Sequence, residues 1–150
     1  MVIHTSQALL MSIKNNALEI TKQRHEKYAP YWAAGLVIFG ATGLATTRFD
    51  LGSFWSGYVL DMVGPAWNYI LFRGLFTYHK DNAWTRFFTP VVTVSLFLIV
   101  CFSIELAQLL ELYEATYDPW DFLAYTSILV PLFILDVIQN SNRKLENLRA

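Results

Sequence analysis

The chain of 150 residues has few charged residues and almost no cysteine. Charged residues make up 15% of the sequence and hydrophobic residues 55%, whereas an average soluble domain is about 25% charged. This composition excludes intrinsic disorder, and the net charge of -1, without a basic run, argues against a nucleic-acid partner. The single cysteine, Cys101, excludes an intrachain disulfide and a multi-cysteine metal site. The length suits one domain.

Long apolar stretches dominate the sequence, over residues 31–47, 54–76, 87–112 and 120–138. A bilayer core of about 30 Å requires about 20 helical residues, which each stretch approaches or exceeds. Helices of a soluble bundle would carry a charged stripe, but the third stretch has no charged residue from Phe87 to Ile104. The sequence therefore predicts an all-α, polytopic membrane protein with a bundle of four transmembrane helices, whose first partner is the lipid bilayer.

The positions of lysine and arginine predict the orientation of this bundle. Of the 11 basic residues, 10 lie before the first stretch, at or between the second and third, or after the fourth; the exception is Arg48. Because cytoplasmic loops carry an excess of Lys and Arg, this pattern places both termini in the cytoplasm. We therefore predict a multi-pass protein of the bacterial cytoplasmic membrane with two short outer loops.

Residues 1–30 are not a typical secretory signal, because the apolar run starts too late. Apolar residues recur there at helical spacing, at Leu10, Ile13, Ala17 and Ile20. This spacing predicts a cytoplasmic N-terminal segment that forms an amphipathic helix on the inner leaflet, with a solvated or poorly ordered extension as the alternative. Residues 31–138 are then the membrane domain and residues 139–150 a cytoplasmic tail.

Acidic side chains inside the apolar stretches are the main candidates for a functional site, because an ionisable group is costly in a membrane. Asp61 and Glu105 each lie about seven residues from the outer end of their stretch, which is roughly 10 Å deep at 1.5 Å per residue. Asp121 enters the same outer half of the fourth stretch, whereas Asp136 lies near the cytoplasmic end. In each stretch the polar residues share one helical face, which we expect to turn away from lipid.

These residues predict an acidic pocket that is open toward the outside. Its members are Asp61, Asn68, Glu105, Gln108, Asp121 and Tyr125. Carboxylates held together at low dielectric favour a proton or a cation among them. The structural alternatives are polar contacts between helices for Asn68 and Gln108, and buried hydrogen bonds without activity for Asp61 and Glu105.

The start of the fourth stretch has the pattern of a helix N-terminus. Asp118 is predicted as the helix cap, with Pro119 at the first helical position and Asp121 at the third. Pro65 and Pro131 interrupt the second and fourth stretches. They predict either ordinary kinks, which transmembrane helices tolerate, or a broken-helix binding site.

Histidine is absent from the predicted pocket, because His4, His25 and His79 all fall on the cytoplasmic side. A zinc site of the usual kind and a Ser–His dyad within the membrane are therefore not expected. The chain has no P-loop, dinucleotide fingerprint or haem-attachment motif. We expect no cofactor and no resident metal; paired carboxylates are capable of acid–base work, so whether the chain is an enzyme stays open.

The segments FSIELAQ (residues 102–108) and YDPWDFLAY (residues 117–125) together resemble the signature of VanZ-like proteins, which are small bacterial membrane proteins. That family carries Glu-x-x-Gln in one helix and, after a short loop, Asp-x-x-Asp-x-x-Ala at the start of the next. The residues that match by position are Glu105, Gln108, Asp118 and Asp121. Tyr125 stands where the VanZ form has asparagine, as in a related family with Ala-Tyr, and Ile128 stands where glycine is usual. Because the namesake is linked to glycopeptide-antibiotic tolerance, the resemblance implies a role in the cell envelope.

Three functions are consistent with this sequence. The first is binding of a cation, or of the polar head of an envelope lipid or cell-wall precursor, at the acidic pocket. The second is a structural or assembly subunit of a membrane complex or homo-oligomer, held by the same polar residues. The third is a small proton-coupled transporter or an intramembrane enzyme. Transport would require an oligomer, because four spans are few for a monomeric carrier.

Overall fold

The computed structural model describes residues 2–49, 52–77, 83–112 and 116–147, and these contain helices and no strand. The elements in chain order are α1 (Val2–Thr46), the π-helical turn η1 (Trp55–Val59), α2 (Leu60–Arg73), α3 (Ala83–Phe87), α4 (Pro90–Leu109) and α5 (Asp121–Asn147). The predicted all-α class is confirmed.

Three segments are long and apolar enough to cross a membrane, namely Glu26–Thr46, Pro90–Leu109 and Asp121–Asn140. They correspond to the first, third and fourth predicted spans and indicate a membrane protein. Large apolar side chains remain exposed along α4, as expected for a lipid-facing helix: Val91, Val92, Leu96, Ile99, Val100, Phe102, Ile104, Leu106 and Leu109. The second predicted span is not among the three, since α2 has only 14 residues, so the bundle of four spans is not confirmed.

Several helix boundaries differ from the predicted ones. α1 passes through residue 30 without a break, so the N-terminal segment continues the first span as one helix. α4 begins at Pro90 rather than at residue 87, because extended Thr89 caps it by accepting a hydrogen bond from the Val92 N–H at 3.3 Å. α2 ends at Gly74, whose φ of 58° is the left-handed conformation that glycine adopts without strain. α5 continues past residue 138 to Asn147.

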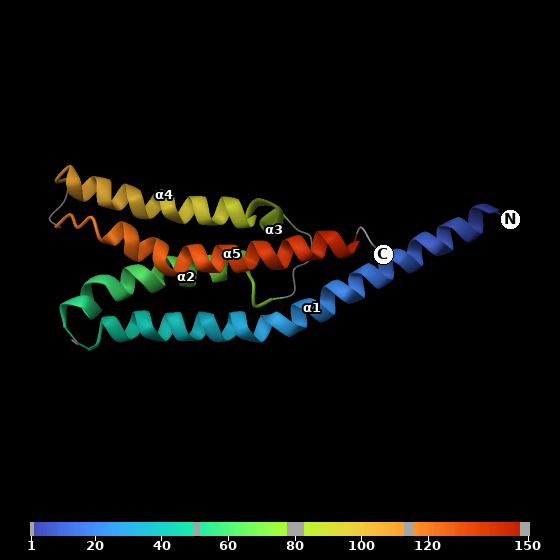
Figure 1. The fold of residues 1–150 in the computed structure, drawn as a ribbon, viewed down its shortest axis with the longest axis horizontal. Helices are drawn as coiled ribbons and strands as arrows, with labels where there is room; N and C mark the ends of the chain where they lie inside the picture. Colours follow the sequence, from blue (N-terminus) through green and yellow to red (C-terminus); the bar gives the residue numbers. More distant parts are fainter. Residues whose placement is uncertain (1, 50–51, 78–82, 113–115, 148–150) are drawn as a thin grey trace.

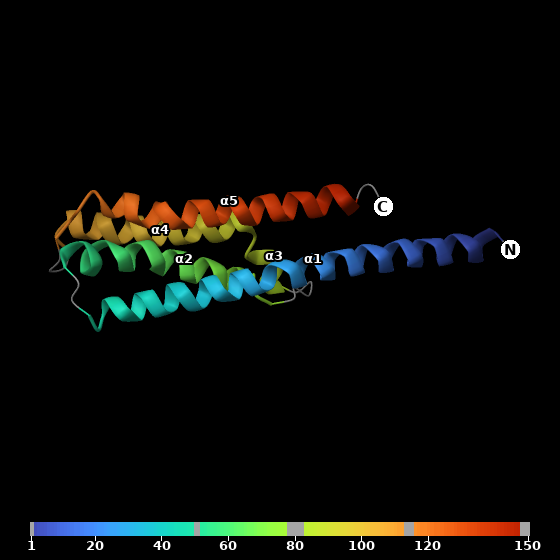
Figure 2. The same cartoon turned by 60° about the horizontal axis from the view of Figure 1, so that its bottom comes forward.

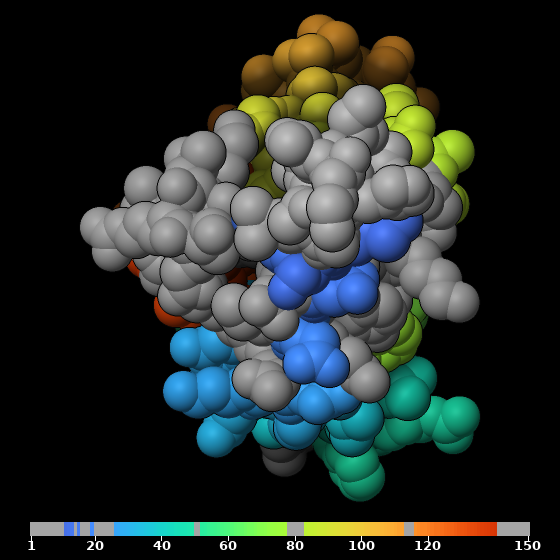
Figure 3. Space-filling model, turned by 90° about the vertical axis from the view of Figure 1, so that its right-hand side faces the viewer, coloured from blue at the N-terminus to red at the C-terminus, as the bar shows by residue number. Residues whose placement is uncertain are grey.

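α2 is the central helix of the molecule. It packs against α1 on one side and against α4 and α5 on the other, whereas α1 has no comparable contact with α4 (Figures 1 and 2). The view along the helices shows α4, in yellow to orange, at the top and the light blue part of α1 at the bottom (Figure 3). The long helices therefore form a row with α2 in the middle, and α1 and α4 at its two sides do not pack against each other to close a ring.

The two ends of this row carry different connections. The end with residues 47–49, 52–54, 110–112 and 116–120 is called the distal end. The end with residues 74–77 and 83–89, toward which the first turn of α1 and the last turn of α5 point, is called the proximal end (Figure 1). α1 extends well beyond the other helices on the proximal side (Figure 1).

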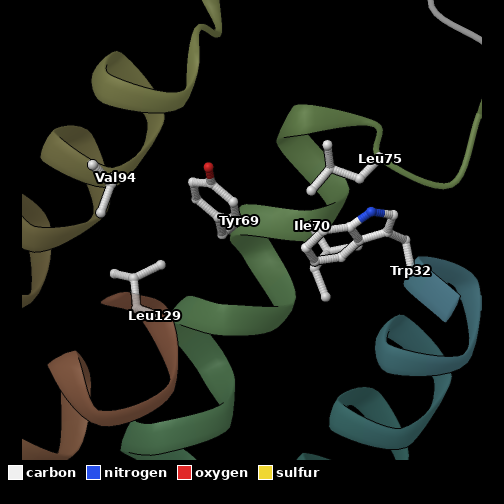
Figure 4. Packing of buried hydrophobic residues seen from close by; sticks show 6 residues of the cluster. All are labelled: Trp32, Tyr69, Ile70, Leu75, Val94 and Leu129. Carbon is white, nitrogen blue, oxygen red and sulfur yellow. The ribbon is translucent and has the colours of Figure 1, made fainter. Parts of the chain in front are cut away.

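The hydrophobic core lies where α2 meets its neighbours. Its buried members are Trp32, Tyr69, Ile70, Leu75, Val94 and Leu129, which come from α1, α2 and the turn after it, α4 and α5 (Figure 4). Glycines bring α1 close to α2, as small residues do between membrane helices. A Cβ atom at Gly40 would lie 2.9 Å from Trp67 Nε1, whereas one at Gly43 would lie 3.6 Å from the nearest atom of Val63.

Candidate acidic site

Glu105 is the most deeply buried of the predicted site residues. It lies in the distal half of α4, its side chain is 0% exposed, and Cys101, one turn earlier, is buried as well. The Tyr125 hydroxyl of α5 donates a hydrogen bond to Glu105 Oε1 at 2.7 Å. This bond joins α4 to α5 inside the protein and gives the buried carboxylate a polar partner.

Asp61 faces Glu105 from the first turn of α2. Its side chain is partly buried, and it interacts electrostatically with Asp121 and Glu105. Asp121, at the first turn of α5, interacts with Glu105 in turn. The structure therefore brings together carboxylates from three helices, together with the hydroxyl of Tyr125.

Asp118 lies just before α5 and organises the start of that helix. Its Oδ1 accepts a hydrogen bond from the Trp120 N–H at 3.0 Å, in a turn just before α5, whose first helical residue is Asp121 and not the predicted Pro119. Its Oδ2 accepts a hydrogen bond from the Tyr58 hydroxyl at 2.5 Å, which ties this turn to η1. The bond from Tyr58, followed by that from Trp120, holds the pKa of Asp118 below its ordinary value.

Asn68 and Gln108 are the two amide residues of the predicted site. The Asn68 Nδ2 donates to the Gly64 carbonyl of its own helix at 2.9 Å, which is a local bond within α2 and not a contact between helices. Gln108 lies half-buried in the last turn of α4, three residues beyond Glu105. The described contacts of these two residues do not test their predicted place in the site.

The carboxylates do not converge on one point. Among the residues that the structure describes, no three His, Cys, Asp or Glu side chains are close enough to hold a metal ion.

An apolar groove of about 350 Å³ lies beside this site, between the η1–α2 segment and the start of α5. Its lining residues are Phe54, Tyr58, Met62, Trp120, Leu123, Ala124 and Ser127. Tyr58, which lines the groove, donates a hydrogen bond to Asp118, so that one carboxylate lies at the edge of the groove.

A buried ion pair at the proximal end was not predicted from the sequence. Arg73 Nε donates to Asp136 Oδ2 at 2.7 Å, and Arg73 Nη2 donates to Oδ1 at 3.1 Å. The Tyr69 hydroxyl (2.7 Å) and the Asn140 Nδ2 (2.8 Å) donate to the same carboxylate, while Arg73 Nη1 donates to the Phe88 carbonyl at 2.6 Å. Arg73 is 7% exposed and Asp136 1%, so both charges are out of solvent and fully paired.

The sequence did contain a signal for this pair. The positive-inside pattern assigns Arg73 to the cytoplasmic side, and Asp136 is the one acidic residue that the sequence places near the cytoplasmic end of its stretch. Opposite charges at the same predicted depth in two apolar stretches indicate a partnership, because a charge inside a membrane protein is almost always paired.

Comparisons with known proteins found no match: no protein-family model, no curated protein and no solved structure matches the chain. The resemblance to VanZ-like proteins therefore stays a prediction that depends on the motif residues.

Proposed function

We propose that this chain is a VanZ-like membrane protein with four spans, whose acidic site binds a cationic group at the outer face of a bacterial cytoplasmic membrane. The observation that carries the proposal is the approach of Asp61, Glu105 and Asp121 from three different helices. Arg48 is the only basic residue in the connections at that end. In the described part of the chain, the charged groups that interact with Asp61 and Asp121 are other carboxylates, and carboxylates brought together in this way favour a positive occupant.

The proposal of a second span is supported by the helical residues that precede α2. Residues 53–73 are helical without interruption, because η1 joins the turn at residue 53 to α2. These 21 residues extend about 30 Å at 1.5 Å per residue, which matches the bilayer core. Its one basic residue, Arg73, is paired with Asp136, so its charge is not left unpaired in the span.

An ammonium-type group suits the site better than a metal ion. The separate carboxylates give acceptors at several positions and no common centre for metal ligation. An ammonium group is held by a charge-assisted hydrogen bond to a single carboxylate, so it does not require several ligands around one point. On the predicted topology the distal end faces outside, so the ligand comes from the envelope and the role is an envelope-associated one.

The test uses the full chain in a neutral maltoside detergent and two probes, butylammonium chloride and magnesium chloride, against sodium chloride at equal ionic strength. A ligand at 100 times its Kd stabilises the folded state by about 2.7 kcal/mol, and each kcal/mol raises the melting temperature of a chain this size by roughly 2–4 °C. We expect butylammonium to raise the melting temperature and magnesium to have no such effect.

Variants localise the effect. Glu105→Gln and Asp61→Asn should abolish the stabilisation by butylammonium. Glu111→Gln is the matched control, because Glu111 is an exposed glutamate at the same end of the molecule. The proposal is wrong if butylammonium acts no better than sodium, or if it stabilises Glu105→Gln as strongly as the wild type.

A further inference from the structure

The groove beside the acidic site has the form of a site for a hydrocarbon chain. Phe54, Tyr58 and Met62 are spaced four residues apart and line one wall from a single face of the η1–α2 segment. The other wall is formed by α5, where Leu123, together with its neighbours, lines the groove. The lining is almost entirely apolar, with the Ser127 hydroxyl already donating to the Ala124 carbonyl at 2.7 Å.

A carboxylate lies at the polar edge of the groove. Tyr58 lines the groove, and its hydroxyl donates a hydrogen bond to Asp118. Asp121 interacts electrostatically with Asp118 and Glu105, and Asp61 with Asp121 and Glu105. A molecule whose tail occupies the groove can therefore place its head beside Asp118, within the field of the other carboxylates, which repels an anion and attracts a cation.

We propose that the groove holds the hydrocarbon tail of a lipid-type amine, whose positively charged head lies at the acidic site. This inference rests on the proposed function and names the class of its ligand. In a bilayer a tail is surrounded by lipid as apolar as the groove, so the tail alone provides little selectivity. The selectivity comes from the head, and the groove determines where the molecule lies.

The experiment uses the full chain in neutral maltoside with a sixteen-carbon alkylamine that carries a photoactivatable diazirine in mid-chain. A sixteen-carbon fatty acid with the same diazirine is the comparison, because it has the same kind of tail and an anionic head. After irradiation, peptide mapping by mass spectrometry locates the label. We expect the amine to label residues 54–62 and 120–127 about tenfold more than the acid does, which corresponds to about 1.4 kcal/mol of selectivity.

A matched pair of variants tests the groove itself. Ser127→Phe places a ring in the groove, and we expect it to reduce labelling by the amine at least fivefold. Ser103→Phe is the control, because Ser103 on α4 is also exposed and its hydroxyl also donates to a carbonyl of its own helix, that of Ile99, at 2.7 Å. Circular dichroism and monodisperse elution establish that both variants are folded.

The outcomes separate this inference from the proposed function. Equal labelling by amine and acid, or unchanged labelling in Ser127→Phe, overturns the lipid-type amine even if butylammonium still stabilises the protein. If the groove is labelled in the detergent-extracted protein but not in native membranes, a protein segment fills it in the membrane. That result also overturns the inference. Failure of butylammonium to stabilise the wild type overturns the proposed function.

Discussion

Replacing Asp136 with alanine should destabilise the protein more than any single change at the distal site. The substitution leaves the Arg73 guanidinium buried, with only the Phe88 carbonyl among the hydrogen-bond partners described above. Removing one partner of a buried ion pair costs about 3–5 kcal/mol. That is a large part of the 5–15 kcal/mol that stabilises a typical folded protein.

The same reasoning predicts a strong coupling between the two charges. Arg73→Met alone should also be costly, because it leaves the Asp136 carboxylate buried without its cation. The double variant Arg73→Met with Asp136→Leu removes both charges, so its loss should be smaller than the sum of the single losses by about 2 kcal/mol or more. It should still be less stable than the wild type, because the Tyr69 hydroxyl loses its acceptor at a cost of about 1–3 kcal/mol.

The assay is unfolding by sodium dodecyl sulfate in mixed maltoside micelles, followed by circular dichroism, for the wild type, both single variants and the double variant. A loss within about 0.5 kcal/mol for Asp136→Ala, the range of an ordinary surface substitution, would refute the reasoning. Strict additivity of the two single losses would refute the coupling, since it would mean that the charges do not stabilise each other.

Three further predictions concern other parts of the molecule. Gly40→Ala should cost about 1–3 kcal/mol, because the new Cβ lies 2.9 Å from Trp67 and displaces its indole, whereas Gly43→Ala should be neutral or slightly stabilising; thermal melting of both variants checks this. Tyr125→Phe should cost about 1–3 kcal/mol in the same assay, because it removes the hydrogen bond to a buried carboxylate, and an unchanged stability would contradict that role. Because the folded-state pKa of Asp118 is lowered, its stabilisation is present above its unfolded pKa of about 3.9 and is lost as the pH falls through the folded value. The difference in melting temperature between wild type and Asp118→Asn should therefore shrink below about pH 4, and a difference independent of pH would count against it.

Helical periodicity and depth are the two features of the sequence from which the acidic site could be predicted. The 3.6-residue repeat fixes which side chains share a face, and the rise per residue fixes their depth. Those two quantities placed Asp61 and Glu105 at the same height, and the structure brings them within electrostatic range of each other. They do not fix which helices are neighbours, because short connections allow several arrangements. The central position of α2 could not be derived for that reason.

The sequence also did not show the hydrogen-bond partners of two polar side chains, Asn68 and Arg73. Asn68 bonds to the carbonyl of Gly64 in its own helix, and a helical face alone does not distinguish such a bond from a contact between helices. The sequence assigns Arg73 to the cytoplasmic side, with the basic residues of the loops, because it lies near the end of an apolar stretch. Its long side chain instead turns inward to Asp136, and only the position of α5 shows this.

The central helix has a mechanical consequence for the site. α2 carries Asp61 in its first turn and Arg73 at its last residue, about 18 Å apart at 1.5 Å per residue. A helix cannot turn about its axis at one end while the other end is anchored, unless its own hydrogen bonds break. The two hydrogen bonds that Arg73 donates to Asp136 therefore fix the rotational orientation of Asp61 from the other end of α2.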